Sequence, residues 1–377
     1  MKTTLLLLLI PGAFCCLQAQ KADQAKFIIL MVGTYTSSGT NEGIFVYDFD
    51  YETGKGTLKS SIAGGENPSF LTISSDGKYV YAVNEVKKGT VSSFAFDSNT
   101  GGLRFLNRVP SGGDSPCFVE FDTEDKFVYA ANYGDGTLAA IPVNPDGTLN
   151  PSIQVIRHEG SSIDKARQQG PHVHSTFVSP DNRFLLVPDL GTDKVNIYNI
   201  KKGVSADPLT PADPAFVSVR PGTGPRHLAF SRNGRFVYLV HEMGAIISVY
   251  SYTNGKLSEI QTIPMTSQGF TGKSGAADIH LSPDGEFLYA SNRGDANDLA
   301  IYSVKKNGSI THVANKPILG RSPRNFAIDP TGKYLLVANQ GSNEIVVFLR
   351  DKKTGALTPL PERIKVSRPV CLKFLPD

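Results

Sequence analysis

The chain contains a unit that recurs about every 46 to 55 residues along nearly its whole length, and this repeat constrains the fold more than any other feature. The clearest copy runs from Gly224 to Tyr250. It opens on Pro225, alternates apolar and polar residues, turns at Asn233-Gly234 and continues in a second strand, Phe236 to Val240. Alternation with period two, broken by an Asn-Gly pair, predicts a β-hairpin.

Five further copies of this unit begin at Asn67, Ser115, Gly170, Ala276 and Ser322, and a truncated copy, RPVCLKFLPD, ends the chain. Each full unit predicts four short strands. In the copy from Ser322 these are Asn325–Asp329, Tyr334–Ala338, Glu344–Leu349 and Ile364–Val366. Four strands in a repeat of this length are typical of one blade of a β-propeller.

The two ends of the chain complement each other. Residues 26–62 carry two strand-like runs, Phe27–Val32 and Gly43–Phe49, and a turn at Thr53-Gly54, but lack the Pro-led opening strand. The C-terminus supplies that strand alone. We therefore expect Val370–Phe374 to be the inner strand of the N-terminal blade, which closes a ring of seven blades and removes a free sheet edge. A β-sandwich is the alternative all-β fold, but it does not predict half a unit at each end.

Residues 1–20 have the pattern of a secretory signal peptide, and residues 21–377 form the propeller domain. Lys2 precedes an apolar run, Leu5 to Ile10, and Leu17-Gln18-Ala19 is a small-residue cleavage site. We expect export to the periplasm or the medium, with cleavage after Ala19. The alternative is a lipoprotein acylated on Cys15 or Cys16, against which Phe14 argues.

The composition excludes several classes of protein. The formal net charge is only +3 and the basic residues are scattered, so neither nucleic acid nor a charged membrane surface is an expected partner. No segment of the mature chain is apolar enough to span a bilayer. Cys117 and Cys371 alone remain after signal cleavage, which predicts buried free thiols rather than a disulfide framework.

In a propeller, the residue after each opening Pro falls at an equivalent point around the central channel. In chain order these residues are Ser69, Cys117, His172, Arg226, Asp278 (with Ala277 in place of Pro), Arg324 and Val370. The ends of the second strands return to the same face, as Asn84-Glu85, Asn132-Tyr133, Asp189-Leu190, His241-Glu242, Asn292-Arg293 and Asn339-Gln340, with Thr34-Tyr35 as the N-terminal counterpart.

Charged groups that converge on a narrow channel must pair, stay hydrated or bind something. A residue that recurs in most blades serves the blade, so we expect Asn84, Asn132, Asn292 and Asn339 to hydrogen-bond within the structure. The residues that break the repeat are the functional candidates: catalytic roles for His172, His174, Arg226, Glu242 and Arg293, and substrate binding by His241, Arg324, Glu85 and Tyr133. His227 and His280 are expected in the core or at its rim.

No metal or cofactor site is predicted. His172-x-His174 alone is a common strand pattern, and no carboxylate cluster has ligand spacing. The sequence also lacks a phosphate-binding loop, a dinucleotide fingerprint and a Gly-x-Ser-x-Gly nucleophile elbow.

The chain resembles the bacterial lactonase family of seven-bladed propellers, whose named member is 6-phosphogluconolactonase and whose fold is shared by the fungal carboxy-cis,cis-muconate cyclase. The resemblance spans residues 27–377. It rests on Val32-Gly33-Thr34-Tyr35-Thr36, Gly170-Pro171-His172-Val173-His174, Gly224-Pro225-Arg226-His227, His241-Glu242 and Ser291-Asn292-Arg293-Gly294. It implies a site at the channel mouth on His172 or His174, Arg226, Glu242 and Arg293.

The resemblance also implies the chemistry. Hydrolysis of a sugar δ-lactone needs a base for water and cations for the developing oxyanion. Glu242 or a histidine could be the base, and Arg226 and Arg293 could hold the oxyanion or a substrate carboxylate or phosphate. We expect a small sugar lactone as the only partner of a monomer or weak oligomer. A lactonising enzyme like the muconate cyclase and a non-catalytic binding propeller stay open as alternatives.

Overall fold

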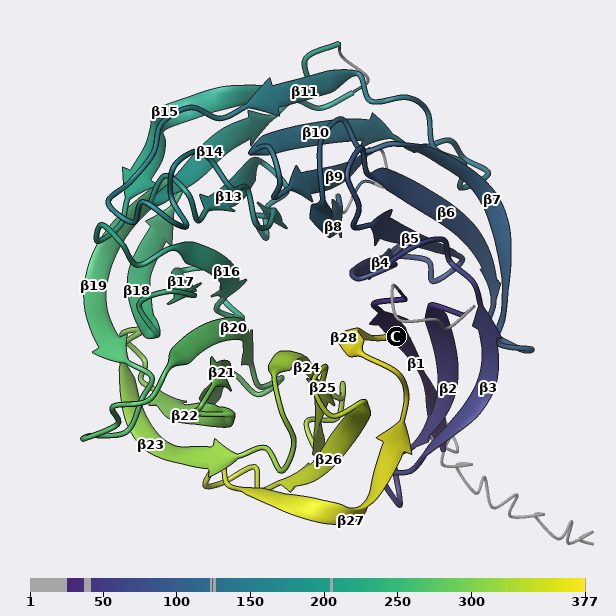
Figure 1. Cartoon of the computed structure of the whole chain (residues 1–377), viewed down its shortest axis with the longest axis vertical. Coiled ribbons are helices and arrows are strands. Elements are labelled where there is room, and N and C mark those ends of the chain that lie inside the picture. The colour runs from purple at the N-terminus through teal and green to yellow at the C-terminus, as the bar shows by residue number, and fades with distance from the viewer. Residues whose placement is uncertain (1–25, 37–41, 123, 125–126, 204–205, 377) are drawn as a thin grey trace, which may run out of the picture.

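The computed structural model describes residues 26–36, 42–122, 124, 127–203 and 206–376. Within these ranges the chain forms strands and no helix, so no helix in this part is long and apolar enough to cross a membrane. The predicted signal peptide, with Cys15 and Cys16, lies outside the described residues. Seven four-stranded antiparallel sheets form a ring around a central channel, which confirms the predicted seven-bladed β-propeller (Figure 1).

Each blade is numbered by its place in the chain, and its strands are given from the channel outward. Blade 1 is β28 (Pro369–Phe374), β1 (Phe27–Thr34), β2 (Ile44–Asp50) and β3 (Gly56–Ile62). Blade 2 is β4 (Leu71–Ile73), β5 (Tyr79–Asn84), β6 (Thr90–Asp97) and β7 (Gly102–Pro110). Blade 3 is β8 (Pro116–Phe121), β9 (Phe127–Asn132), β10 (Thr137–Pro142) and β11 (Gln154–Arg157). Blade 4 is β12 (Phe177–Val178), β13 (Phe184–Asp189), β14 (Lys194–Ile200) and β15 (Leu209–Ser218).

Blades 5 to 7 continue the same order. Blade 5 is β16 (Pro225–Phe230), β17 (Phe236–His241), β18 (Ile246–Thr253) and β19 (Lys256–Pro264). Blade 6 is β20 (Ser274–Leu281), β21 (Phe287–Gly294), β22 (Asp298–Val304) and β23 (Ile310–Pro317). Blade 7 is β24 (Pro323–Ile328), β25 (Tyr334–Asn339), β26 (Glu344–Arg350) and β27 (Leu357–Lys365). The outer strand of blade 7 is longer than the predicted Ile364–Val366.

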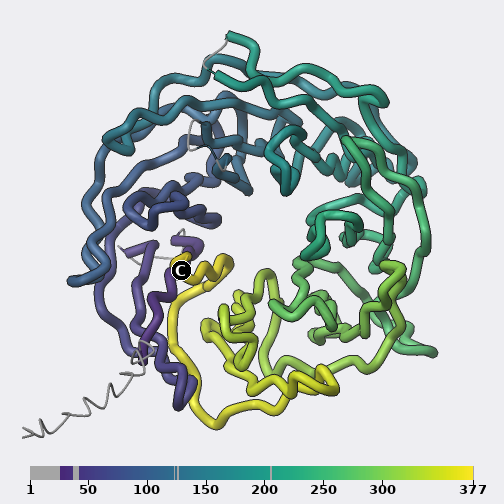
Figure 2. Tube along the Cα trace, turned by 180° about the vertical axis from the view of Figure 1, so that it is seen from behind, coloured from purple at the N-terminus to yellow at the C-terminus, as the bar shows by residue number. Residues whose placement is uncertain are grey.

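The ring closes as predicted, because the C-terminal β28 pairs with the N-terminal β1. Leu372 lies opposite Val32, and Leu30 lies opposite Phe374. Viewed from behind, the last and first segments of the chain lie side by side at the channel (Figure 2). The ladder satisfies the backbone groups that both strands would otherwise expose at a sheet edge.

The core lies between neighbouring blades. The second strands are buried on both faces, as in Phe127–Asn132 and Tyr334–Asn339, whereas an outer strand such as Lys256–Pro264 contains only exposed and partly buried residues. Each blade therefore buries apolar side chains against the next one, and no blade has a core of its own. Cys117 and Cys371 are buried free thiols, as predicted.

Candidate active site

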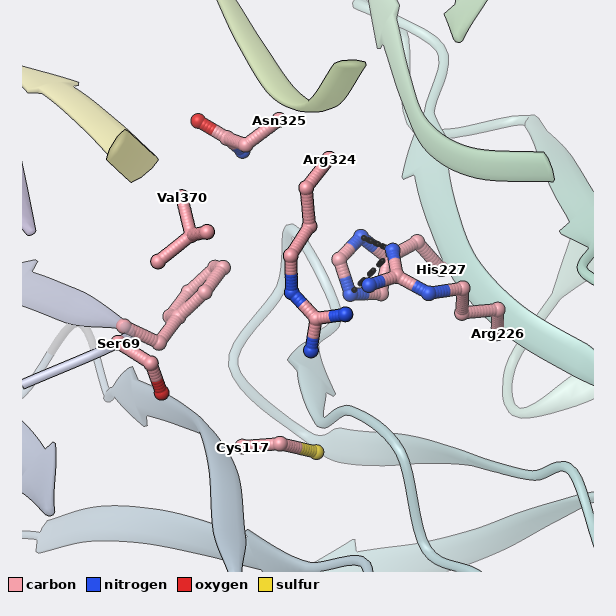
Figure 3. Close-up of a pocket in the computed structure, with 8 residues that line it drawn as sticks. Ser69, Cys117, Arg226, His227, Arg324, Asn325 and Val370 are labelled. Carbon is pink, nitrogen blue, oxygen red and sulfur yellow. Dashed lines mark hydrogen bonds between the residues drawn. The ribbon is translucent and has the colours of Figure 1, made fainter. Parts of the chain in front are cut away.

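In several blades a β-bulge near the start of the inner strand leaves a residue unpaired at the channel. In blade 5 the pairing of β16 with β17 shifts between Pro225 and His227, which leaves Arg226 in a β-bulge. The equivalent shift leaves Arg324 unpaired in blade 7 and Cys117 in blade 3. Figure 3 shows Arg226 and Arg324 extending toward one another across a space that Cys117 also lines. This bulge places the predicted arginines at the channel mouth.

The strand pairing shows that two of the residues predicted to line the channel at equivalent points are wrong. In blade 4, Val173 pairs with Asp189, and in blade 5 Pro225 pairs with the equivalent His241. Val173 therefore corresponds to Pro225, and the residue that corresponds to Arg226 is His174 and not His172. In blade 6, Ala276 lies opposite Asn292, which places Ala277 at the bulge. The error has a simple cause. The channel position depends on strand pairing, and neither Pro171 nor Ala277 occupies the position of the Pro in the other blades.

Asp278 is instead deeper in the channel, where it serves the structure. One carboxylate oxygen lies 2.8 Å from Nδ1 of His227 and the other 2.9 Å from Nε2 of His280. The second oxygen also accepts a hydrogen bond from the Asn325 amide. His227 is buried and His280 is partly exposed, which confirms the prediction of core and rim positions.

The ends of the second strands divide their residues between the blade interior and the mouth, because successive residues of a strand point to opposite sides. Asn84 donates to the Gly64 and Glu66 carbonyls, in the structural role expected from its recurrence. His241 takes the same position in blade 5. Its ring nitrogens lie 2.9 Å from Thr223 Oγ1 and 3.1 Å from Ser248 Oγ, and it is fully buried. The structure thus places His241 outside the mouth, unlike its neighbour Glu242.

Glu242 is the centre of the mouth. Its Oε2 lies 3.1 Å from Nε of Arg226, 3.0 Å from Nη2 of Arg293 and 3.9 Å from Nε2 of His174. Its Oε1 accepts a hydrogen bond of 2.8 Å from Nη2 of Arg167. Burial alone would raise the pKa of this carboxyl, but the Arg293 and Arg226 guanidinium groups outweigh it and hold the pKa well below its usual value. Glu242 is therefore ionised and weakly basic at neutral pH.

The two arginines on Oε2 are also anchored to the backbone. Arg293 donates from Nε to the Gly275 carbonyl and from Nη2 to the Ala276 carbonyl, both at 3.0 Å. Arg226 donates from Nη1 to the Ala277 carbonyl. Burial, together with the nearby Arg293, lowers the pKa of Arg226 to about 10, so the group still carries its charge at neutral pH. Both guanidinium groups are fixed before any ligand arrives.

A second carboxylate, Glu85, faces Arg324. Oε2 of Glu85 accepts hydrogen bonds from Tyr35, at 2.7 Å, and from the Ser69 hydroxyl. Nη2 of Arg324 is 4.0 Å from Oε1, and its guanidinium lies over the Tyr35 ring, 5.4 Å from the centroid. Among the described residues Arg324 donates no hydrogen bond within normal distance. It is the mouth arginine whose donors are available to a ligand.

His174 lies between Glu242 and Cys117. Its Nδ1 is 3.8 Å from the Cys117 sulfur, and that thiol donates to the His174 carbonyl at 3.3 Å. Burial raises the pKa of Cys117, so the group is a thiol and not a thiolate. Burial and the Arg226 guanidinium hold the pKa of His174 well below its usual value. Nδ1 of His174 thus faces the sulfur, and Nε2 faces Glu242 at the mouth.

His172 and Tyr133 form the outer wall. Their rings stack with centroids 4.5 Å apart, and Nδ1 of His172 donates to the Tyr133 carbonyl at 2.8 Å. Tyr133 also meets His174 edge-on, at 5.5 Å. The predicted pair His172 and His174 is therefore split, with His174 in the cluster and His172 behind Tyr133.

Arg167 is the residue that sequence reasoning missed. It comes from the connection between β11 and β12, and its Nη2 contacts the Tyr133 hydroxyl at 3.1 Å as well as Glu242. The connection has no counterpart in the repeat, so no sequence signal marked it. Tyr35 is the counterpart of Glu85 in the repeat, but the repeat pattern does not predict a functional role for it.

Below the mouth the channel narrows to a cavity of about 10 Å³, lined by Ser69, Phe70, Cys117, Arg226, His227, Arg324, Asn325 and Val370 (Figure 3). That volume holds about one water molecule. A ligand must therefore sit above Arg226 and Arg324. Within the described residues no group of three His, Cys, Asp or Glu side chains has the geometry of a metal site.

Residues 29–374 match the family model described as lactonase, 7-bladed beta-propeller. The chain belongs to the lactonase family of seven-bladed propellers. Among the relatives of this lactonase, a 6-phosphogluconolactonase from Formosa agariphila is 38% identical over 80% of this chain and 86% of its own. The 6-phosphogluconolactonase of Bacillus subtilis is 35% identical over 91% of this chain and 97% of its own. The solved structure of the Pseudomonas aeruginosa periplasmic gluconolactonase superposes with a TM-score of 0.88 at 39% identity, over 93% of this chain and 99% of its own.

Proposed function

We propose that the protein hydrolyses a sugar δ-lactone in carbohydrate metabolism, as its relatives' names describe. The observation that carries the proposal is the mouth itself. It combines a neutral histidine, an ionised carboxylate held by three guanidinium groups, and a fourth guanidinium with available donors. This set can activate water and stabilise the negative charge that develops on a lactone carbonyl.

His174 is the proposed general base. Its Nε2 removes a proton from water as the water oxygen attacks the lactone carbonyl carbon. The tetrahedral intermediate then collapses, the bond between the carbonyl carbon and the ring oxygen breaks, and His174 returns the proton to that oxygen. The product is the open hydroxy acid. Glu242, 3.9 Å from Nε2, balances the imidazolium charge while it exists.

Arg324 is the proposed donor to the oxyanion. Arg226 and Arg293 donate to Glu242 and to backbone carbonyls, whereas Arg324 has a 4.0 Å ion pair with Glu85 and a contact with the Tyr35 ring, and donates no hydrogen bond of normal length to a described residue. A planar guanidinium can form two parallel hydrogen bonds to an oxyanion. Glu242 is the weaker candidate for the base, because the same arginines that orient it depress its pKa.

We further propose that the enzyme works outside the cytoplasm as a monomer, on an unphosphorylated aldonolactone. The support is the signal-like pattern of residues 1–20 and the naming of one solved relative as a periplasmic gluconolactonase. The second candidate substrate is 6-phosphogluconolactone, because two other relatives are named 6-phosphogluconolactonase. The molar mass of the exported protein in solution tests the oligomeric state. Its N-terminus, determined by mass spectrometry, tests the cellular location.

A lactone panel on purified mature protein tests the activity. We expect hydrolysis of δ-gluconolactone, and loss of about 100-fold or more in kcat for His174→Gln, the scale of general base catalysis. Arg324→Ala should lose about 100- to 1,000-fold, the scale of one oxyanion donor. Asn84→Ala, within a blade, is the matched control and should keep the wild-type rate. Saturable lactone binding without turnover would instead support a binding propeller.

A further inference from the structure

Arg350 of β26 fills the cleft between blades 6 and 7 on the face opposite the mouth. Its side chain is fully buried, and Nη2 lies 3.1 and 2.9 Å from the two oxygens of Asp284. Nε donates to the Tyr289 hydroxyl at 2.9 Å, and Nη1 to the Gly332 carbonyl at 3.0 Å. The guanidinium also lies over the Phe287 ring, 5.6 Å from its centroid. Four groups of the cleft thus act together as one arginine side-chain site.

The repeat places the same site one blade earlier, between blades 5 and 6. The backbone NH of Val304 donates to the Glu286 carbonyl, just as that of Arg350 donates to Lys333, so Val304 takes the place of Arg350. By the same register Tyr238 corresponds to Tyr289, Asn233 to Asp284 and Gly285 to Gly332.

Without an arginine the space between blades 5 and 6 is open. A groove of about 540 Å³ is lined by each of these counterparts, Asn233, Phe236, Tyr238, Gly285 and Val304. The Tyr238 side chain is fully buried, and its hydroxyl has no hydrogen-bond partner among the described residues. A buried hydroxyl without a partner costs free energy that a bound donor would recover. The groove therefore retains the tyrosine hydroxyl, the glycine carbonyl, one side-chain oxygen and the aromatic wall of the Arg350 site, while the Asn233 amide replaces the charged carboxylate of Asp284.

Charges at the rim indicate what carries that guanidinium. Glu286 lines the groove on the blade 6 side and favours a cation, whereas the Asp284 carboxylate, which also lines it, already pairs with Arg350. Arg232, Lys305 and Lys306 line the rim as exposed side chains, and none of the three has an ion pair among the described residues. A ligand with a guanidinium and adjacent carboxylates satisfies both sets, whereas a bare cation satisfies only one.

We propose that the groove between blades 5 and 6 is a docking site for an arginine side chain of a partner polypeptide, flanked there by acidic residues. The guanidinium takes the position that Arg350 takes one blade later, between the Tyr238 hydroxyl, the Asn233 side-chain oxygen and the Gly285 carbonyl. The site lies on the face opposite the lactonase mouth and is independent of the proposed hydrolysis.

Calorimetric titration of the full mature chain with a short synthetic peptide, acetylated and amidated, with Arg between two Asp residues, tests the proposal. We expect saturable binding at one site. The same peptide with citrulline, which keeps the shape of arginine without its charge, should bind at least about tenfold more weakly, the scale of a charge-assisted hydrogen bond. Tyr238→Phe should weaken binding several-fold.

Three further variants separate the groove from a general surface effect. Val304→Arg rebuilds the internal arginine, so it should abolish peptide binding, raise Tm and leave lactone hydrolysis at the wild-type rate. Val304→Trp places a bulky uncharged side chain in the groove and should also block binding, which covers the case in which Val304→Arg fails to fold. Arg350→Ala opens the cleft between blades 6 and 7 and should raise the stoichiometry to two peptides per chain.

Absence of saturable peptide binding to the wild type, or binding that persists in both Val304 variants, would overturn the proposal. Binding of agmatine but not of the peptide would overturn the assignment to a polypeptide.

Discussion

Glu242 and Arg167 lie 75 positions apart in the chain, and Oε1 of Glu242 accepts a hydrogen bond of 2.8 Å from Nη2 of Arg167. Two other guanidinium groups contact this carboxylate, and both are largely buried. Arg226 lies on the inner strand of blade 5, and Arg293 lies on the second strand of blade 6. Arg167 comes from a loop and its side chain is 43% exposed. It is therefore the partner of Glu242 that an incoming substrate meets first.

Arg167→Gln should weaken substrate binding more than it slows the chemical step. The loss of one charged donor at the rim is expected to raise KM about tenfold with little change in kcat, because the charged donor is worth about 1.5–3 kcal/mol. Steady-state kinetics on δ-gluconolactone measures both constants. Arg157→Gln is the control, since Arg157 is an exposed arginine whose ion pair is with Asp135. Equal KM values for wild type and Arg167→Gln would show that the loop does not contact the substrate.

Glu242→Gln should destabilise the protein as well as inactivate it. The amide leaves Arg226 and Arg293 buried without their counter-charge, and removal of one partner of a buried ion pair costs about 3–5 kcal/mol. Denaturant unfolding at pH 7 measures this loss. Glu85→Gln is the comparison, because Glu85 faces a single guanidinium at 4.0 Å and should lose less stability. Equal losses in the two variants would contradict the central role of Glu242.

The acid limb of the pH–rate profile should lie below the ordinary histidine range. His174 acts as a base only when it is neutral, and its pKa is held well below 6.5 by burial and Arg226. The value of kcat/KM should therefore stay constant as pH falls from 7.5 to 6 and decrease only at lower pH. A midpoint at or above 6.5 would assign the base to another group.

The free energy of unfolding should fall as pH falls below 6.5. Burial lowers the pKa of His241 to about 4 and, with Arg226, that of His227 to about 3. Between these values and 6.5 the unfolded chain binds more protons than the folded protein, so acid favours unfolding in that window. His241→Asn places there the residue that four other blades carry and removes one titrating group. Its unfolding free energy, measured by urea at pH 7 and pH 5, should change less with pH than that of the wild type.

Removal of residues 368–377 should cause association. The truncation deletes β28 and exposes the ladder edge of β1 from Leu30 to Thr34, which is buried in the intact ring. Light scattering should detect aggregates that the full chain does not form. A truncated protein that stays monomeric, with unchanged Tm, would show that closure by β28 is dispensable.

The sequence alone predicts the repeat because the patterns that specify strands and turns are local. Alternating apolar residues and Gly-containing turns specify strands and hairpins within each blade, and the half-unit at each end specifies the closure of β28 on β1. The same repeat identified Arg226, Glu242 and Arg293, since each of them breaks a pattern that the other blades keep.

Which of these side chains share the site follows from the packing of the blades. His174 rather than His172 enters the cluster because the pairing of Val173 with Asp189 sets the bulge, and that pairing is not encoded by the spacing from Pro171. Arg167 joins Glu242, and Cys117 meets His174, across contacts between different blades. The repeat pattern alone specifies the blades, the closure and five charged residues of the mouth, Arg226, Glu242, Arg293, Arg324 and Glu85. The register of the bulges and the contacts across the channel depend on how seven sheets pack around one axis, which no local pattern records.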